Sequence, residues 1–157
     1  MRKMKPSDVD GLYKVLSDAD TMTHVEPPFS FEQTKRFAKT YGICDDPKVF
    51  ALIYDKSKLL IGHVIFHPFD DDVLENRYGK GKVYELGWVI RKDFWGQGIA
   101  TETAFALIDY SKTHDISALV IECDPDCFAS TRIAQKLGFA RQTPDGSQLE
   151  QFVLALK

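Results

Sequence analysis

The N-terminal third of the chain carries the spacing of amphipathic helices. Ser7 is a residue type that caps helices, and the apolar positions after it fall on one helical face. Those positions are Val9, Leu12, Tyr13 and Leu16. Ser30, with Gln33 three residues later, matches a capping box and predicts a second helix that runs to about Thr40. A short strand can precede Ser7.

The middle of the chain changes to the pattern of strands. Apolar and β-branched residues fill positions 49–54 and 59–66, and the four polar residues between them predict a hairpin. A polar loop is predicted at residues 70–82, and a third strand follows at residues 83–90.

The C-terminal half alternates helices and strands. A long helix is predicted after Gly98, then a strand at residues 118–123, a helix at 128–137 and a closing strand at 148–156. One face of the first of these helices carries Ala100, Thr103, Ala104, Leu107 and Ile108, and the second helix has Ala129, Ile133 and Leu137 in line. The order of elements predicts a mixed α/β fold with a largely antiparallel sheet, as a single domain over residues 1–157.

Composition and charge narrow the possible functions. The 157 residues are 44% hydrophobic and 27% charged, which excludes a disordered, collagen-like or low-complexity chain. With 20 Lys and Arg against 23 Asp and Glu, nothing favours nonspecific binding to nucleic acid. The sequence has neither an apolar run of membrane-spanning length nor the apolar segment of a signal peptide. We therefore expect a cytoplasmic protein with no membrane partner.

The metal-ligating residue types show no metal-binding pattern. Cys44, Cys123 and Cys127 are odd in number and match no zinc spacing, so free thiols in a reducing cytosol are expected. His63 and His67 lie at and just beyond the end of one predicted strand, on no ligand spacing. No metal is expected.

The most informative segment is the loop around Gly96 and Gly98, between a strand and a helix. Backbone N–H groups at a helix start lack internal partners, and the helix dipole adds partial positive charge there, so such a loop can hold an anion. A tight turn without a ligand is an equally open alternative. A Rossmann fingerprint is excluded because Thr101 occupies the position of its third glycine, and no Gly-Lys-Ser/Thr of a P-loop follows.

The loop resembles that of the GNAT family of acyl-CoA-dependent N-acetyltransferases, which reads Q/R-x-x-G-x-G/A between a strand and a helix. Trp95 departs from that pattern, and the variant W-G-x-G-x-A-T-E is typical of the branch that includes the ribosomal-protein alanine N-acetyltransferases. A second block, from Asp126 to Phe139, is similar to that branch's N-x-x-S-x-R-V-x-E-K-L-G-F. The resemblance implies the GNAT fold, a mixed and mostly antiparallel sheet with splayed central parallel strands, flanked by helices.

The resemblance implies acetyl-CoA as cosubstrate, with its pyrophosphate on the glycine loop and its pantetheine arm along the preceding strand. The residues it assigns to the cofactor are Trp88, Val89, Ile90, Arg91, Trp95, Gly96, Gln97, Gly98, Ile99, Ala100, Thr101, Cys127 and Ser130. Arg91 either reaches the cofactor or is a solvated strand end.

Glu85 is the candidate base, because it aligns with the strand glutamate that serves as base in the histone acetyltransferase branch. The alternative is a structural glutamate held by a hydrogen-bond partner. An ordinary carboxylate is a weak base, so a water relay or a more basic environment would be needed.

The acid side of the reaction departs from the wider family. Many members protonate the leaving thiolate with a tyrosine on the last helix, and that position is Ala134 here. Ser130 matches the serine proposed for this role in the ribosomal branch, and it either hydrogen-bonds the sulfur or is only a first-turn helix residue. Cys127 replaces the usual Asn and offers weaker hydrogen bonds to pantetheine, or is simply a small buried residue.

The resemblance places the acceptor between the first two helices, where Glu26, Phe29 and Phe31 lie. A carboxylate beside aromatic rings can receive an ammonium group. The alternative is a Pro-rich turn whose rings pack on the second helix. An α-amino group has a pKa of about 8 and is partly neutral at neutral pH, so a peptide or protein N-terminus or a small primary amine is the expected acceptor.

These residues predict an N-acetyltransferase in which a neutral amine attacks the thioester directly. Two alternatives stay open: a non-catalytic sensor of CoA or acyl-CoA, favoured by Cys127 and Ala134, and an antibiotic-modifying acetyltransferase. The sequence does not separate a monomer from a homodimer.

Overall fold

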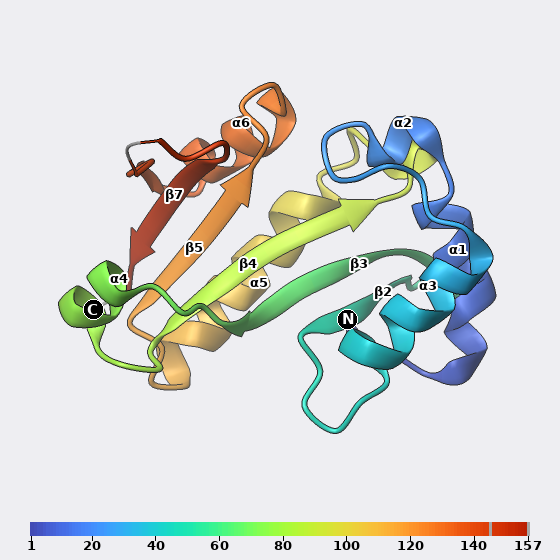
Figure 1. Ribbon diagram of the computed structural model, residues 1–157, viewed down its shortest axis with the longest axis horizontal. Coiled ribbons are helices and arrows are strands. Elements are labelled where there is room, and N and C mark those ends of the chain that lie inside the picture. Colours follow the sequence, from blue (N-terminus) through green and yellow to red (C-terminus); the bar gives the residue numbers. More distant parts are fainter. Residues whose placement is uncertain (145, 157) are drawn as a thin grey trace. The chain divides into compact units, whose positions relative to one another are not determined.

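Seven strands hydrogen-bond into one sheet in the computed structural model, which describes residues 1–144 and 146–156 (Figure 1). Their order is β1-β2-β3-β4-β5-β7-β6. β4 and β5 pair in parallel, whereas β1–β2, β2–β3, β5–β7 and β6–β7 pair antiparallel. The strands are β1 (Arg2–Lys3), β2 (Val49–Tyr54), β3 (Leu59–Pro68), β4 (Val83–Ile90), β5 (Ala118–Cys123), β6 (Ala140–Arg141) and β7 (Glu150–Ala155). The predicted mixed, mostly antiparallel sheet is confirmed.

The helices fall between the strands as the periodicity predicts, with two additions. They are α1 (Val9–Leu16), α2 (Ala19–Met22), α3 (Phe31–Phe37), α4 (Asp72–Tyr78), α5 (Ile99–Thr113) and α6 (Phe128–Lys136). Short 3₁₀ turns cover Pro6–Asp8 and Lys92–Phe94, and a π-helical turn covers Ala38–Gly42. α2 and α4 are the additions: no element is predicted at residues 19–22, and α4 falls within the loop predicted at residues 70–82.

The backbone forms two compact units. The first comprises Met1–Phe66 with Trp88–Ile99, and the second His67–Gly87 with Ala100–Lys157. In the first unit the apolar face of α1 meets β2, β3 and the end of β4 in a buried core. That core is formed by Met4, Leu12, Val15, Leu16, Met22, Ala38, Val49, Ala51, Leu60 and Val89.

Gly62 explains how closely two strands approach in the first unit. A Cβ atom at this position would lie 2.1 Å from the carbonyl oxygen of Val89 and 3.0 Å from the Cα of Ile90. Such contacts are too short for any side chain. Glycine at position 62 therefore lets the backbone of β3 lie directly against the end of β4.

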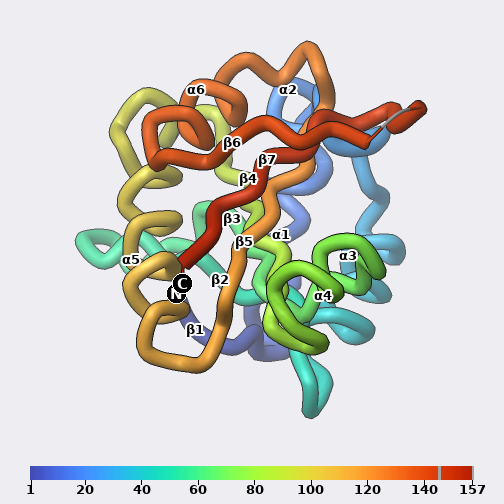
Figure 2. The backbone as a smooth tube through the Cα atoms, turned by 90° about the vertical axis from the view of Figure 1, so that its left-hand side faces the viewer, coloured from blue at the N-terminus to red at the C-terminus, as the bar shows by residue number. Residues whose placement is uncertain are grey.

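The second unit has α4 on one side of its strands and α5 on the other, as both views show (Figures 1 and 2). Leu74 of α4 packs in a core cluster with Val83 of β4, Val120 of β5 and Val153 of β7. Side chains alternate along a strand, so residues two positions apart lie on the same side of the sheet. Glu85 of β4 and Glu122 of β5 therefore lie on the same side as α4.

Two predicted helix boundaries are wrong. α1 does not begin at Ser7: a 3₁₀ turn precedes it, and the capping interactions belong to Asp8. The Asp8 carboxylate accepts a hydrogen bond from the Lys5 N–H and pairs with the Arg2 guanidinium, both at 2.7 Å. At Ser30 the capping box is confirmed, with reciprocal bonds to Gln33, although α3 ends at Phe37 and the chain continues in π-helical form.

The polar loop predicted at residues 70–82 is also wrong, because it contains α4. The Asp71 side chain accepts a 2.9 Å hydrogen bond from the Leu74 N–H and caps the helix, while Leu74 itself is buried. Of the α6 residues, Ala134 is buried, whereas Ala129 is exposed and Ile133 is half-buried. The start of α4 was missed because its capping residue, Asp71, lies in a run of aspartates that is equally typical of a loop.

Candidate functional site

The end of β4 is joined to the glycine loop by an aromatic side chain. The Trp95 indole Nε1 donates a 2.6 Å hydrogen bond to the carbonyl oxygen of Ile90, the last residue of the strand. The backbone N–H of Arg91 donates to the Ile61 carbonyl at 2.8 Å, which continues the contact with β3. Val89 and Ile90 are buried and Trp88 is half-buried, so the predicted pantetheine strand is firmly held.

Both loop glycines adopt backbone conformations that favour glycine. Gly96 has φ of 70° and Gly98 has φ of 79°, in the left-handed region. A Cβ atom at either position would meet no protein atom within 4 Å, so backbone conformation and not crowding selects glycine here. Gln97 between them donates from Nε2 to the Asp93 carbonyl at 3.1 Å. The open space above both residues leaves the backbone approachable.

The loop leads directly into the 15-residue helix α5, which starts at Ile99. Gly96, Gln97 and Gly98 are exposed, whereas Ile99, Ala100 and Thr101 in the first turn are half-buried. The first N–H groups of a helix have no carbonyl partner within it, and the helix dipole makes this end positive. Backbone N–H groups at such a helix start can hold an anion, and the exposed residues Gly96, Gln97 and Gly98 directly precede it.

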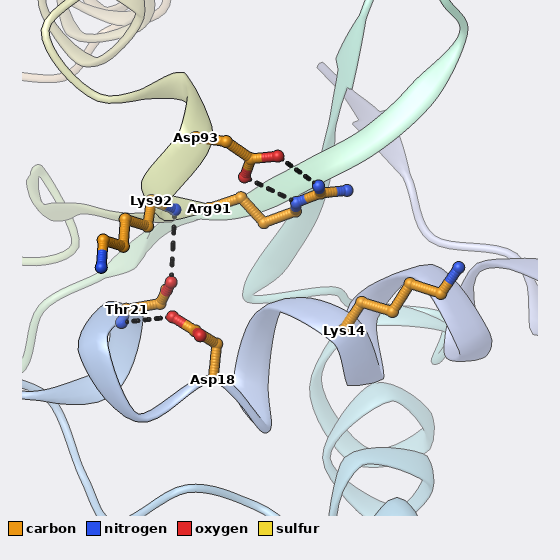
Figure 3. A pocket seen from close by; sticks show the side chains of 6 residues that line it. All are labelled: Lys14, Asp18, Thr21, Arg91, Lys92 and Asp93. Atoms are coloured by element: carbon orange, nitrogen blue, oxygen red, sulfur yellow. Dashed lines mark hydrogen bonds and ion pairs between the residues drawn. The ribbon is translucent and has the colours of Figure 1, made fainter.

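A pocket of about 490 Å³ lies beside the strand end, lined by Lys14, Asp18, Thr21, Arg91, Lys92 and Asp93 (Figure 3). The Arg91 guanidinium pairs with Asp93 through two hydrogen bonds, one of 3.0 Å from Nε, and lowers the pKa of that carboxyl. The Lys92 N–H donates to the Thr21 hydroxyl at 3.3 Å. Arg91 is thus neither a free strand end nor an unpaired charge.

Sequence reasoning missed the α1–α2 side of this pocket. Asp18 caps α2 by accepting a 2.7 Å hydrogen bond from the Thr21 N–H, and this bonding with Thr21 lowers the pKa of the carboxyl. The lining carries three cationic side chains and two carboxylates. The only signal in the sequence was a helix-capping residue type at Asp18, in a stretch that is too short for periodicity to show a helix.

Glu85 lies on β4 of the second unit, beside a histidine from the neighbouring strand. The carboxylate Oε2 is 3.1 Å from Nε2 of His67, and the two side chains are 23% and 19% exposed. Glu85 therefore has a close polar partner on the neighbouring strand, and the imidazole of that partner can bind a proton. The pairing was missed because strand register cannot be read from one sequence, and His67 was considered only as a metal ligand.

Cys127 and Ser130 lie together at the start of α6. The Cys127 thiol donates to the Ser130 hydroxyl oxygen at 3.3 Å, and both residues are half-buried. Because the serine oxygen accepts this bond, its own proton stays available for a different acceptor. Nearby, burial raises the pKa of the Cys123 thiol, which keeps that cysteine in its unreactive protonated form.

The predicted acceptor residues are not gathered into one cluster. Phe29 is half-buried, packs against the first unit's core and meets the Phe37 ring edge-on at 5.8 Å. Phe31 meets Tyr13 edge-on at 5.4 Å, and Glu26 is exposed. The packing of the two phenylalanines matches the alternative of a Pro-rich turn resting on α3.

Two absences hold for the described part of the chain. Among residues 1–144 and 146–156, no three His, Cys, Asp or Glu side chains gather so that they could hold a metal ion. None of the helices described there is long and apolar enough to cross a membrane.

Known proteins resemble this chain over nearly all of its length. The acetyltransferase (GNAT) domain model matches residues 1–140. The uncharacterized N-acetyltransferase YnaD of Bacillus subtilis is 28% identical over 145 residues, which cover 90% of this chain and 79% of YnaD. A GNAT-family acetyltransferase from Bacillus anthracis superposes with a TM-score of 0.81 at 25% identity, covering 99% and 93% of the two chains. A ribosomal-protein-alanine N-acetyltransferase from Brucella melitensis shares the fold, with a TM-score of 0.65, 15% identity and coverage of 97% and 95%.

Proposed function

Because the chain belongs to the GNAT acetyltransferase family and is an N-acetyltransferase, we propose that it moves an acetyl group from acetyl-CoA to a primary amine. The observation that carries the cofactor assignment is the loop of Gly96 and Gly98 at the start of α5. Two left-handed glycines there leave the backbone N–H groups open to an approaching pyrophosphate. Trp95 holds the loop against the strand end.

The pantetheine arm would lie along Trp88, Val89 and Ile90. The Ile90 carbonyl already accepts a hydrogen bond from the Trp95 indole. Strand-like pairing with pantetheine would therefore first use the backbone N–H and carbonyl groups of Trp88 and Val89. Cys127 stands where the family usually has Asn, and its thiol is turned to Ser130. We therefore assign Cys127 to orienting Ser130, and the pantetheine contact of an Asn is lost.

The chemistry is a single displacement in a complex of both substrates. Glu85 removes one proton from the acceptor ammonium, and the freed lone pair forms the C–N bond as the C–S bond breaks. The second proton leaves the nitrogen as the amide forms and ends on the CoA sulfur. Ser130 donates its hydroxyl proton in a hydrogen bond to that sulfur, because its oxygen is engaged by the Cys127 thiol.

The acceptor we favour is an α-amino group, as in the ribosomal-protein branch, or another small primary amine. An α-amino group has a pKa of about 8 and a lysine side chain one of about 10. The base therefore removes a proton from an α-amino group more easily than from a lysine. Glu26 and Phe31, which are both exposed, are the residues we assign to receiving it, since a carboxylate and the face of an aromatic ring both attract a cation.

The first experiment is calorimetric titration of acetyl-CoA and of CoA into the protein. We expect binding in the micromolar range for the natural chain. Gly98→Asp should abolish it, because a side chain at φ of 79° strains the loop and its charge repels the pyrophosphate. Gly98→Asn is the matched control, with the same shape and no charge, and should keep part of the affinity. Full affinity in folded Gly98→Asp contradicts the loop assignment.

The acceptor is then sought with acetyl-CoA and three amines: an alanine-terminated peptide, spermidine and an aminoglycoside. Acetylated product is identified by mass, which avoids thiol reagents that can also react with free cysteines of the protein. Glu85→Gln should lower turnover with little change in acetyl-CoA affinity. Binding without acetylation of any amine would favour a sensor, and acetylation of the aminoglycoside alone would favour an antibiotic-modifying enzyme.

A further inference from the structure

His67 and Glu85 face each other across two adjacent strands of the second unit. The backbone N–H of Phe69 donates a 2.9 Å hydrogen bond to the Val83 carbonyl, which fixes the antiparallel register of β3 and β4 at this point. His67 of β3 is two residues before Phe69, and Glu85 of β4 is two residues after Val83. In an antiparallel pair these two positions lie directly opposite each other. Their 3.1 Å contact is thus built into the sheet and does not depend on a loop.

The two ring nitrogens of His67 contact different kinds of oxygen. Nδ1 lies 2.6 Å from the Pro68 carbonyl oxygen, which can only accept, so Nδ1 carries a hydrogen. In the neutral ring Nε2 then has a lone pair, which faces the carboxylate of Glu85 and repels it. The contact becomes a hydrogen bond only when one further proton lies between Nε2 and Oε2.

We infer that His67 is the positioning residue of the base, sharing with Glu85 the proton that Glu85 takes from the acceptor amine. The inference rests on the proposed function, in which Glu85 is that base. Before the reaction the ring is neutral and the carboxylate ionised, and the pair has no bridging proton. An N–H bond of the ammonium breaks, the electron pair stays on nitrogen, and the proton is held between Oε2 and Nε2. The pair returns it to solvent after the products leave.

This arrangement answers the weakness of a lone carboxylate as a base. Glu85 alone gains nothing beyond its own O–H bond when it accepts a proton. Beside His67, the same proton also removes the repulsion between two lone pairs and creates a charge-assisted hydrogen bond. The transferred proton is then shared in one hydrogen bond between the two side chains, as in other coupled pairs.

The elements packed around the pair contribute both neutral and charged side chains. Opposite Glu85 on β5 lies Val120, which has no charge. The next residue on the same side of β5 is Glu122, whose Oε1 accepts a 3.3 Å hydrogen bond from the buried Gln151 of β7. The titratable or charged side chains of the neighbouring helix α4 are Asp72, Glu75, Arg77 and Tyr78.

The direct test is an NMR titration of the imidazole C–H groups between pH 4 and 9, which requires no acceptor. The His67 signal is assigned by its loss in His67→Gln, whose amide can still donate to Glu85 and holds no titrating proton. We expect the His67 pKa above the ordinary value of about 6.5, and lower by about one unit or more in Glu85→Gln. The same pKa in both proteins overturns the inference. If Glu85→Gln does not fold, a natural-chain pKa at or below 6.5 overturns it.

The kinetic test separates this inference from the proposed function. With the best amine of the panel at pH 7.5, His67→Gln should lower kcat about tenfold or more and leave the KM for acetyl-CoA unchanged. In the Glu85→Gln background the same change should have no further effect. If His67→Gln lowered kcat by the same factor in the Glu85→Gln background as in the natural chain, His67 would not act through Glu85. Unchanged turnover in Glu85→Gln would instead refute the base assignment, while the NMR titration still reports the pairing.

Discussion

Acid stability should depend on a buried histidine in the first unit. His63 is 3% exposed on β3, and the Phe37 ring lies 5.3 Å away. Within residues 1–144 and 146–156, its Nδ1 is a buried side-chain nitrogen without a hydrogen-bond partner. Burial lowers the pKa of His63 from 6.5 to about 4, because a charged ring would lose its hydration there.

The direction and size of the effect follow from proton linkage. Between pH 6.5 and 4 the unfolded chain protonates this histidine and the folded chain does not, so stability falls as the pH falls. The stabilisation is complete above pH 6.5 and is lost towards pH 4. One pH unit between the two pKa values corresponds to about 1.4 kcal/mol, so the whole window costs about 3 kcal/mol. That is a large part of the roughly 5–15 kcal/mol of a typical domain.

The assay is urea unfolding at half-unit pH steps from 7.5 to 4, on the natural chain and on His63→Leu. Leucine has similar volume and no titrating group, so its stability curve should lose about 3 kcal/mol of pH dependence in this window. Removing an unpaired buried nitrogen should also leave the variant at least as stable at pH 5. Parallel curves for the two proteins between pH 6.5 and 4 would refute the reasoning.

Asp8→Asn provides a control with a different pH window. The hydrogen bond from Arg2 lowers the pKa of the Asp8 carboxyl below its ordinary 3.8, so its contribution is present above that pH and is lost below it. The variant should therefore be less stable by the same amount throughout pH 5–7.5. A changed slope there would assign part of the effect to Asp8.

Three other substitutions test the packing, the helix cap and the cofactor contact. Gly62→Ala places a Cβ 2.1 Å from the Val89 carbonyl oxygen and should cost about 1–3 kcal/mol in urea unfolding; an unchanged midpoint would contradict the close approach of β3 and β4. Asp71→Ala removes the cap of α4 and should cost about 1 kcal/mol, with unchanged acetyl-CoA affinity in calorimetry. Cys127→Asn restores an amide donor and acceptor and should tighten CoA binding several-fold, whereas weaker binding would mean that the thiol itself contacts the cofactor.

The strands were predictable because apolar and polar residues alternate along them, or because apolar residues form runs of strand length. β2, β4 and β5 have the predicted bounds, and the capping box at Ser30 identified a helix start from two residues. α2 has four residues and α4 seven, too few for a helical period to show. Asp18 and Asp71 were the available cap signals for these helices, but isolated aspartates are equally common in turns.

The candidate site divides in the same way. Gly96 and Gly98 were identified from their place between a strand and a helix, and their left-handed backbone is one that glycine adopts readily. The partners of Glu85, Arg91 and Ser130 were not, since each depends on which backbone lies next to it or on how a turn places a side chain. His67 is the clearest case: its meaning comes from a residue 18 positions away, on another strand.

The hydrogen bond from Trp95 to the Ile90 carbonyl gives this chain a built-in optical signal. Only two tryptophans occur, Trp88 on β4 and Trp95 in the loop. An indole that is 52% exposed and tied to the strand end emits according to its local polarity and its bonding. Ligand contact with the glycine loop should therefore shift or quench the intrinsic emission, and Trp95→Phe should remove that response. Rapid mixing could then time the arrival and departure of a ligand without any label.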